Sequence, residues 1–143
     1  MIKEVPCDIF RGGTSKGLFF LEKDIPKEGP QRDRFLLSVM GSPDIRQIDG
    51  LGGANSLTSK VAIISRSNSN EYDVNYTFAQ VAVDKAIVDY KGNCGNISSA
   101  VGPYAIEMGI VKPNDGLTVV RIFNTNTKRI IYSYVQTPNG KVN

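Results

Sequence analysis

The fold of this chain is organised around the stretch Asn93-Cys94-Gly95-Asn96-Ile97-Ser98-Ser99-Ala100-Val101-Gly102, in which a glycine-rich turn runs directly into a helix. Apolar or small residues then recur at steps of three and four, the pattern of a helix buried along one face. They are Ile97, Ala100, Val101, Tyr104, Ala105 and Met108. Gly109 is a stop signal, so the sequence predicts a helix over 97–108 with Pro103 off its apolar face.

A lone thiol, that of Cys94, lies between Gly92 and Gly95 at the start of this helix. N–H groups without an intrahelical acceptor collect at such an end, where they attract anions and lower the pKa of a thiol. Cys94 is therefore a candidate for a reactive cysteine beside a bound carboxylate. From the residues alone, a small buried cysteine before a packed helix explains the pattern equally well.

Composition indicates one ordinary globular domain with a real core, because 41% of the 143 residues are hydrophobic and 22% are charged. The net charge of +3 arises from residues scattered along the chain, so we expect neither a nucleic-acid partner nor a membrane surface. No apolar run approaches the roughly 20 residues of a membrane span, and no apolar signal-peptide core is present. We expect a cytoplasmic protein.

The chain has two cysteines, Cys7 and Cys94, and no histidine. We expect both thiols to be reduced, with Cys7 in a strand. Because no metal-ligand cluster can be assembled, we expect no metal. A histidine-based triad within this chain is excluded, so acid–base chemistry near pH 7 falls to a lysine, cysteine, carboxylate or tyrosine.

The remaining pattern is mainly that of strands. They are predicted over 2–10, 18–21, 61–64, 72–78, 86–90, 117–123 and 129–135. A shorter covering helix begins at Pro30 and ends at Gly41. The apolar phase changes after Phe78, which predicts a bulge or bend near 79–80, and the residues from Gln136 onward resemble an open end. We expect an α+β domain whose mainly antiparallel sheet curls around the late helix.

Two other segments carry polar groups that suit a site. The turn RGGTSKG (11–17) joins two strands and departs from a phosphate loop, because Ser15 precedes Lys16 and a strand follows. Its N–H groups, with Thr14 and Ser15, suit a carboxylate, although an ordinary glycine hairpin also explains it. Lys60 opens a strand beside the glycine-rich loop 50–55, a position at which an exposed lysine is the usual explanation.

Five motifs taken together resemble the PrpF family, which contains 2-methylaconitate cis–trans isomerase, 4-oxalomesaconate tautomerase and methylitaconate isomerase. They are RGGTSKG (11–17), TSKVA (58–62), FAQV (78–81), GNCGNISSAVGP (92–103) and VRIFNTNT (120–127). The resemblance spans nearly the whole chain. It implies the fold of diaminopimelate epimerase, in which two similar halves each wrap a sheet around a central helix and enclose the active site between them.

Family members are more than twice as long as this chain. The resemblance therefore implies that residues 1–143 are the first, N-terminal domain and that the second domain is absent. We expect the chain to be part of a longer enzyme or a half-unit that pairs, for example as a homodimer. Exposure of the surface that meets the other half would favour such pairing.

The resemblance also implies the site residues. The essential lysine of the family matches Lys60, and its active-site cysteine matches Cys94. Lys60 would remove an allylic proton from an unsaturated polycarboxylate, and Cys94 would donate or relay a proton or lie against the reacting carbon. Which of the two is base and which is acid stays open, and no cofactor is needed. The candidates for carboxylate binding are Gly13, Thr14, Ser15, Gly95 and Asn96.

Two alternatives remain at this stage. A cysteine-based amino-acid racemase or epimerase on the same fold needs a cysteine on each side of the substrate, and only Cys94 is suitably placed here. Alternatively, the isolated chain is a non-catalytic half that binds small polycarboxylates, because catalysis depends on positioning from both sides of a cleft. We expect the isolated half to be inactive. The residues do not choose among the possible polycarboxylates.

Overall fold

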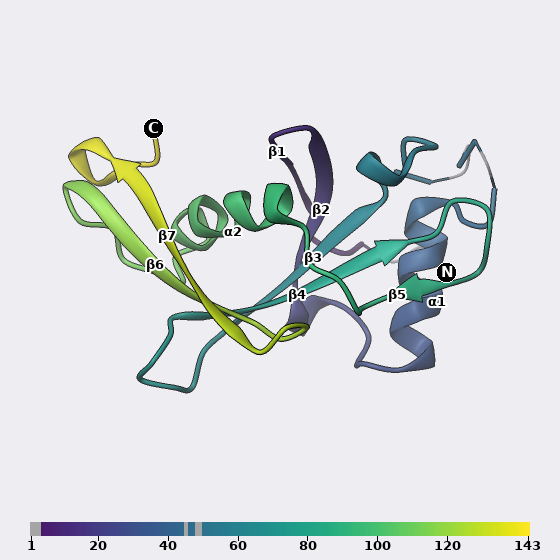
Figure 1. The fold of residues 1–143 in the computed structure, drawn as a ribbon, viewed down its shortest axis with the longest axis horizontal. Helices are drawn as coiled ribbons and strands as arrows, with labels where there is room; N and C mark the ends of the chain where they lie inside the picture. Colours follow the sequence, from purple (N-terminus) through teal and green to yellow (C-terminus); the bar gives the residue numbers. More distant parts are fainter. Residues whose placement is uncertain (1–3, 45, 48–49) are drawn as a thin grey trace.

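The computed structural model describes residues 4–44, 46–47 and 50–143. Over these residues the chain is an α+β domain with one mixed sheet and two α-helices (Figure 1). The strands are β1 (Asp8–Gly12), β2 (Ser15–Leu21), β3 (Lys60–Arg66), β4 (Val74–Val81), β5 (Val88–Asp89), β6 (Gly116–Asn124) and β7 (Arg129–Thr137). The helices are α1 (Pro30–Met40) and α2 (Gly95–Glu107), with short 3-10 turns at Glu22–Asp24, Ser56–Thr58 and Pro138–Gly140.

The sheet curls around α2. Its strand order is β1-β2-β3-β4-β6-β7, with β5 paired to β4. The β2–β3 and β4–β6 pairs are parallel and the others are antiparallel, so the expected mainly antiparallel sheet is confirmed. Because α2 packs against both β1 and β7, which lie at opposite ends of this order, the sheet must bend around the helix. Figure 1 shows α2 between the β1–β2 hairpin and the β6–β7 hairpin.

The helix α2 begins and ends close to the predicted positions. Cys94 is its N-cap, and Gly109, with a φ of 75°, ends it as expected. Pro103 lies inside the helix and is half-buried. Met108 is not a core residue, because it follows the last helical turn and is 37% exposed, whereas Ile106 is buried.

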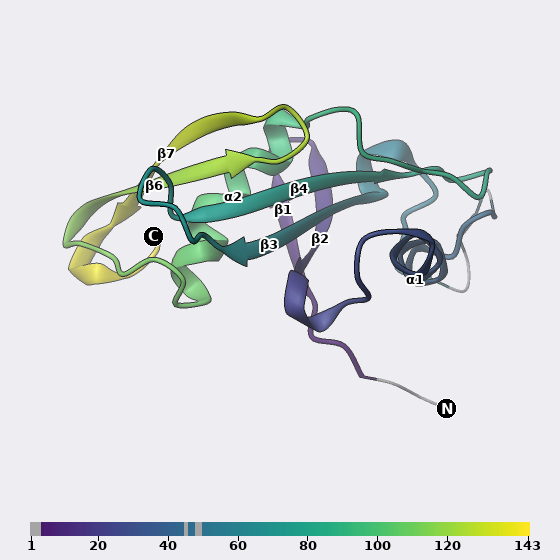
Figure 2. The same cartoon turned by 90° about the horizontal axis from the view of Figure 1, so that it is seen from below.

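The sheet carries a separate apolar cluster on each face. The α2 face includes Tyr76 and Phe78 of β4, whereas the α1 face includes Ala79 and Val81 of the same strand. Figure 2 shows α1, end-on, away from α2. The predicted bulge near 79–80 is wrong, because the β3–β4 register continues without interruption from Arg66↔Val74 to Lys60↔Gln80. The apolar phase changes because successive parts of one continuous strand are covered on opposite faces.

Four other predictions need correction. The first strand begins at Asp8 rather than at Ile2; Ile2 itself lies outside the described residues, and Pro6 lacks the N–H that a paired strand donates. Cys7 is exposed and precedes the strand. The strand predicted over 86–90 is only Val88–Asp89. The predicted open end is also wrong, because β7 continues to Thr137, whose buried hydroxyl lies 2.7 Å from both the Thr118 hydroxyl and the Asn114 carbonyl.

The first helix follows its sequence signals. Pro30 occupies the first turn of α1, and Gly41 follows the helix with a φ of 81°. The helix covers the second face of the sheet through Leu36 and Met40. Of the helices that the structure describes, neither is long and apolar enough to cross a membrane.

Candidate active site at the N-terminus of α2

Three side chains from different elements meet beside the first turn of α2. Lys60 is the first residue of β3, Ser15 is the first residue of β2, and Cys94 caps α2. The Lys60 Nζ lies 3.0 Å from the Ser15 Oγ and 3.4 Å from the Cys94 Sγ. The Ser15 Oγ lies 3.7 Å from the same sulfur. The structure therefore brings the two predicted catalytic side chains into direct contact, with Ser15 as the third corner of a triangle.

The register of the strands produces this meeting. In the parallel β2–β3 pair, Gly17 is opposite Lys60, which places Lys60 beside the start of β2. The β1–β2 hairpin then approaches α2 very closely: a Cβ on Gly12 would lie 1.7 Å from the Asn96 carbonyl oxygen, and one on Gly17 would lie 2.8 Å from the Ile97 Cδ1. At Gly12, where the nearest atoms belong to the backbone, only glycine permits such an approach. The glycines of the RGGTSKG motif thus serve the contact between the hairpin and the helix.

Hydrogen bonds and charge act on the Cys94 thiol. Burial acts to raise its pKa, but the Ile97 N–H, the Ser15 hydroxyl and the Lys60 ammonium together lower the pKa below its ordinary value. The Ile97 N–H donates to the sulfur at 3.5 Å. A half-buried thiol at a helix N-terminus, in contact with a cation, is a setting in which cysteine becomes a thiolate more readily. The structure therefore places Cys94 where its thiolate form is favoured relative to an ordinary cysteine.

The other residues predicted to bind carboxylate lie beside this triangle. Gly13 and Thr14 form the two-residue turn between β1 and β2, and Gly13 has a φ of 54°. The Asn96 side-chain amide donates to the Thr14 hydroxyl at 3.1 Å. A Cβ placed on Gly95 would meet no atom within 4 Å. The tip of the hairpin and the first turn of α2 thus form one polar surface, although the Asn96 amide and the Ser15 hydroxyl already have partners within it.

Sequence reasoning missed the residues that hold the Cys94 turn in place. The Asn93 Oδ1 accepts hydrogen bonds from the Ser98 hydroxyl and from the Asn124 Nδ2, each at 3.0 Å. Asn124 is fully buried at the end of β6, and its own Oδ1 accepts the backbone N–H groups of Asn126 and Thr127. This amide network links the turn before Cys94 to the β6–β7 turn. The NTNT run was visible as part of a motif, but only the fold places it beside Cys94.

A second support holds the segment before Lys60. The Gln47 side chain is 1% exposed, and its Oε1 accepts the Ala54 N–H at 2.7 Å and the Ser59 hydroxyl at 3.1 Å. The loop 50–55 passes close to the end of α1, where the Leu51 N–H donates to the Val39 carbonyl at 2.7 Å. These contacts with α1 and Gln47 hold the loop 50–55 and Ser59, the residue before Lys60, in place.

An open hollow of about 480 Å³ lies beside the N-terminus of α2. It is lined by Asn93, Gly95, Ser98 and Ser99 on one side and by residues 131–134 of β7 on the other. Neither Lys60 nor Cys94 lines it. The hollow adjoins Gly95, one of the residues predicted to bind carboxylate.

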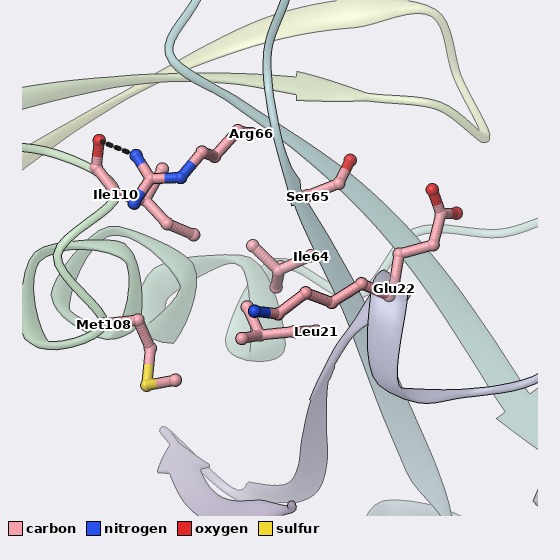
Figure 3. A pocket seen from close by; sticks show the side chains of 8 residues that line it. Leu21, Glu22, Ile64, Ser65, Arg66, Met108 and Ile110 are labelled. Carbon is pink, nitrogen blue, oxygen red and sulfur yellow. Dashed lines mark hydrogen bonds between the residues drawn. The ribbon is translucent and has the colours of Figure 1, made fainter.

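A different hollow, of about 290 Å³, lies at the other end of α2 (Figure 3). Its walls include Leu21, Ile64 and Met108, and Arg66 points across it toward Ile110. The Arg66 guanidinium donates to the carbonyls of Gly109 at 3.2 Å and Ile110 at 3.5 Å, just beyond the helix end. A helix of this length places this hollow about 20 Å from Cys94, so it is not part of the Lys60–Cys94 site. Among the residues described, no three histidine, cysteine, aspartate or glutamate side chains gather as a metal site.

Comparison with curated proteins finds relatives of similar sequence over almost the whole chain. It is 59% identical to a 4-oxalomesaconate tautomerase of Pseudomonas putida, over 96% of this chain and 38% of that protein. It is 53% identical to a 3-methylitaconate isomerase of Eubacterium barkeri, over 96% of this chain and 36% of the relative. A 2-methyl-aconitate isomerase of Cupriavidus necator is 47% identical, over 97% of this chain and 38% of that protein. The chain thus spans less than two fifths of the length of these relatives.

Solved structures give the same relationship. The crystal structure of a methylitaconate-delta-isomerase matches with a TM-score of 0.93 and 52% identity, over 96% of this chain and 36% of that one. A hydroxyproline epimerase from Agrobacterium vitis matches with a TM-score of 0.63 and 12% identity, over 95% of this chain and 39% of the epimerase chain. This likeness shows the fold alone, and it confirms the diaminopimelate-epimerase-like half that we expected from the sequence. A family model described as PrpF protein matches residues 1–143, and the chain belongs to the PrpF family.

Proposed function

We propose that this chain is the N-terminal half of an isomerase that moves an allylic proton in an unsaturated di- or tricarboxylic acid of the 2-methylaconitate type. Three relatives that share about half or more of its residues are named as isomerases or tautomerases of such acids. Their different names, at similar identity, leave the particular polycarboxylate open. The observation that carries the proposal is the 3.4 Å contact between the Lys60 Nζ and the Cys94 Sγ at the N-terminus of α2.

This contact supports a proton shift without a cofactor. Lys60 and Cys94 hold one exchangeable proton between them, and with that proton on the sulfur the neutral Lys60 amine acts as base. Lys60 takes the allylic proton, the conjugated carboxylate carries the negative charge as an enediolate, and Cys94 gives its proton to the other end of the allylic system. The reaction leaves a Lys60 ammonium beside a Cys94 thiolate, and proton return across the contact restores the starting state. Every proton is accounted for within the pair and the substrate.

The substrate carboxylates bind beside this pair in the proposal. The N–H groups of Gly95 and Asn96 belong to the first turn of α2, where no intrahelical acceptor exists, and they suit an anion. Gly13 and Thr14 extend this polar surface from the hairpin side through the Thr14–Asn96 contact. These groups supply contacts to one side of the substrate only. We propose that a second half, of the kind present in the longer relatives, supplies the other side, and that the isolated chain has no turnover.

The proposal is tested on the product of the complete reading frame that contains this chain. The protein is incubated with 2-methylaconitate, 4-oxalomesaconate or 3-methylitaconate in D₂O, and NMR follows the double-bond position and the deuterium content. Isomerisation of at least one acid by the parent, and its loss in Lys60→Ala, is the expected result. Full activity of Lys60→Ala with an unchanged pH dependence would refute the base assignment.

Two alternatives are separated by the same preparation. A cysteine-based racemase or epimerase on this fold would invert a chiral amino acid and leave the unsaturated acids unchanged, which chiral chromatography detects. A non-catalytic half would bind a polycarboxylate without turnover even in the complete product, which calorimetry detects. The Lys60–Cys94 contact favours the isomerase over both.

A further inference from the structure

We propose that Ser15 is a positioning residue that holds the Lys60 Nζ and the Cys94 Sγ together, rather than a group that contacts the substrate. Ser15 is fully buried at the start of β2. Its Oγ lies 3.0 Å from the Lys60 nitrogen and 3.7 Å from the Cys94 sulfur. Both contacts engage the one hydroxyl of the side chain, and its burial leaves it no surface to offer to a ligand.

The chemistry of the three groups sets the direction of each hydrogen bond. A lysine ammonium only donates, so the Ser15 oxygen accepts from Lys60. The single hydroxyl proton of Ser15 is then free to point at the Cys94 sulfur, which accepts when it is a thiolate. Ser15 therefore completes a chain in which Lys60 donates to Ser15 and Ser15 donates to Cys94. This arrangement stabilises the ammonium and thiolate form of the pair, which is the form that the proposed proton shift leaves behind.

The backbone fixes the Ser15 hydroxyl in place. Ser15 is paired with Gly12 across the two-residue turn of the β1–β2 hairpin, and the hairpin is pressed against the Asn96 carbonyl through Gly12. Ser15 thus comes from a hairpin that packs against both α2 and β3. Its role in turnover rests on the proposed function, but its effect on the charge of Cys94 can be measured without any substrate.

The test is the pH dependence of Cys94 alkylation by iodoacetamide in the 143-residue chain. A Cys7→Ser background leaves Cys94 as the only thiol, and the rate follows the thiolate fraction. The titratable neighbours are Lys60 from β3 and Tyr76 from β4; burial raises the pKa of Tyr76, so its phenol stays neutral over the titration. In Ser15→Ala we expect the midpoint to rise by about one pH unit, a roughly tenfold loss of thiolate below the midpoint.

Ser98→Ala is the matched control. The Ser98 hydroxyl bonds to the Cys94 backbone carbonyl at 2.9 Å and to Asn93, and the sulfur is not among its partners. We expect its loss to leave the alkylation midpoint at the parent value, which separates a sulfur contact from a general loosening of the turn. Ser15→Thr, which keeps a hydroxyl, is expected to restore the parent midpoint.

An unchanged midpoint in folded Ser15→Ala would overturn the inference, as would an equal shift in Ser98→Ala. If circular dichroism shows that Ser15→Ala does not fold, Ser15→Thr decides: a midpoint at the parent value supports the inference, and a rise of about one unit contradicts it. None of these outcomes depends on isomerase activity. If the complete protein has no isomerase activity but Ser15→Ala raises the alkylation midpoint of Cys94, only the proposed function is refuted. If the complete protein is active but Ser15→Ala leaves the midpoint unchanged, only the role of Ser15 is refuted.

Discussion

The close approach of the β1–β2 hairpin to α2 predicts a strong effect of a single methyl group at Gly12. In Gly12→Ala the new Cβ would lie 1.7 Å from the Asn96 carbonyl oxygen, 2.7 Å from the Asn96 carbonyl carbon and 3.0 Å from the Ser99 Oγ. The first two atoms are backbone, so no side-chain rotation relieves the overlap. The strain comes from this overlap, because Gly12 does not have a positive φ.

The size of the effect follows from the distance to be gained. The hairpin and the helix must separate by about 1.3 Å before the Cβ reaches even the tight limit of 3.0 Å. Overpacking of this kind costs about 1–3 kcal/mol, and here the backbone must move. The same displacement would lengthen the 3.7 Å contact between Ser15 and Cys94 beyond hydrogen-bond range. We therefore expect a loss of unfolding free energy of about 2 kcal/mol together with a raised alkylation midpoint of Cys94.

Urea unfolding followed by circular dichroism measures the first quantity, and iodoacetamide titration measures the second. Gly92→Ala is the matched control, since a Cβ there meets no atom within 4 Å and its backbone does not have a positive φ. We expect this control to stay within about 0.5 kcal/mol of the parent. If Gly12→Ala is as stable as Gly92→Ala and keeps the parent midpoint, the tight hairpin–helix contact does not determine the geometry of the site.

Three further outcomes are expected. Lys60→Met removes the amino group 3.4 Å from the Cys94 sulfur, so the pH midpoint of Cys94 alkylation rises; a midpoint that stays or falls would mean that Lys60 does not lower the pKa of Cys94. Asp73 accepts from the Arg121 guanidinium at 2.9 Å, which lowers the pKa of Asp73 below its ordinary value of 3.8. Its contribution to stability is complete above that value and is lost as the pH falls through the lowered pKa. Asp73→Asn therefore lowers the melting temperature at pH 7, and the melting temperature of this variant decreases less than that of the parent when the pH is lowered. An equal difference in melting temperature between variant and parent at every pH would exclude this role. Phe19→Ala empties a fully buried position and costs about 3–5 kcal/mol in urea unfolding; a loss below about 1 kcal/mol would mean that the core closes over the cavity.

Local patterns predicted the helices well because their signals lie next to one another in the sequence. Pro30 and Gly41 bound α1 and Gly109 follows α2, as the start and stop signals predict, whereas α2 begins at Gly95, two residues before the predicted start at Ile97. The local pattern misled in β4, where the change in apolar phase predicted a bulge that the structure does not have. Periodicity reports which side of a strand is buried, but it does not tell that a second helix, α1, covers the opposite face of the same strand.

The candidate site shows the same division. Cys94 and Lys60 were visible as a thiol at a helix start and a lysine at a strand start, and the family resemblance joined them. Gln47 carried no local signal. Asn124 was visible as part of the VRIFNTNT motif, but its contact with Asn93, 31 residues away, depends on the fold. The burial of Ser15 was equally invisible, since it depends on β3 and α2 lying on either side of it.

The sequence by itself determined the late helix with a cysteine near its start, the glycine hairpin, the α+β class and the family, because each depends on neighbouring residues or on the order of motifs. Only the tertiary structure decided that the Lys60 Nζ lies 3.4 Å from the Cys94 Sγ and that the Ser15 hydroxyl contacts both atoms. That distance depends on the parallel register of β2 with β3 and on the approach of Gly12 to the Asn96 carbonyl. Both are long-range contacts between segments 43 or more residues apart, and no local propensity sets such a contact.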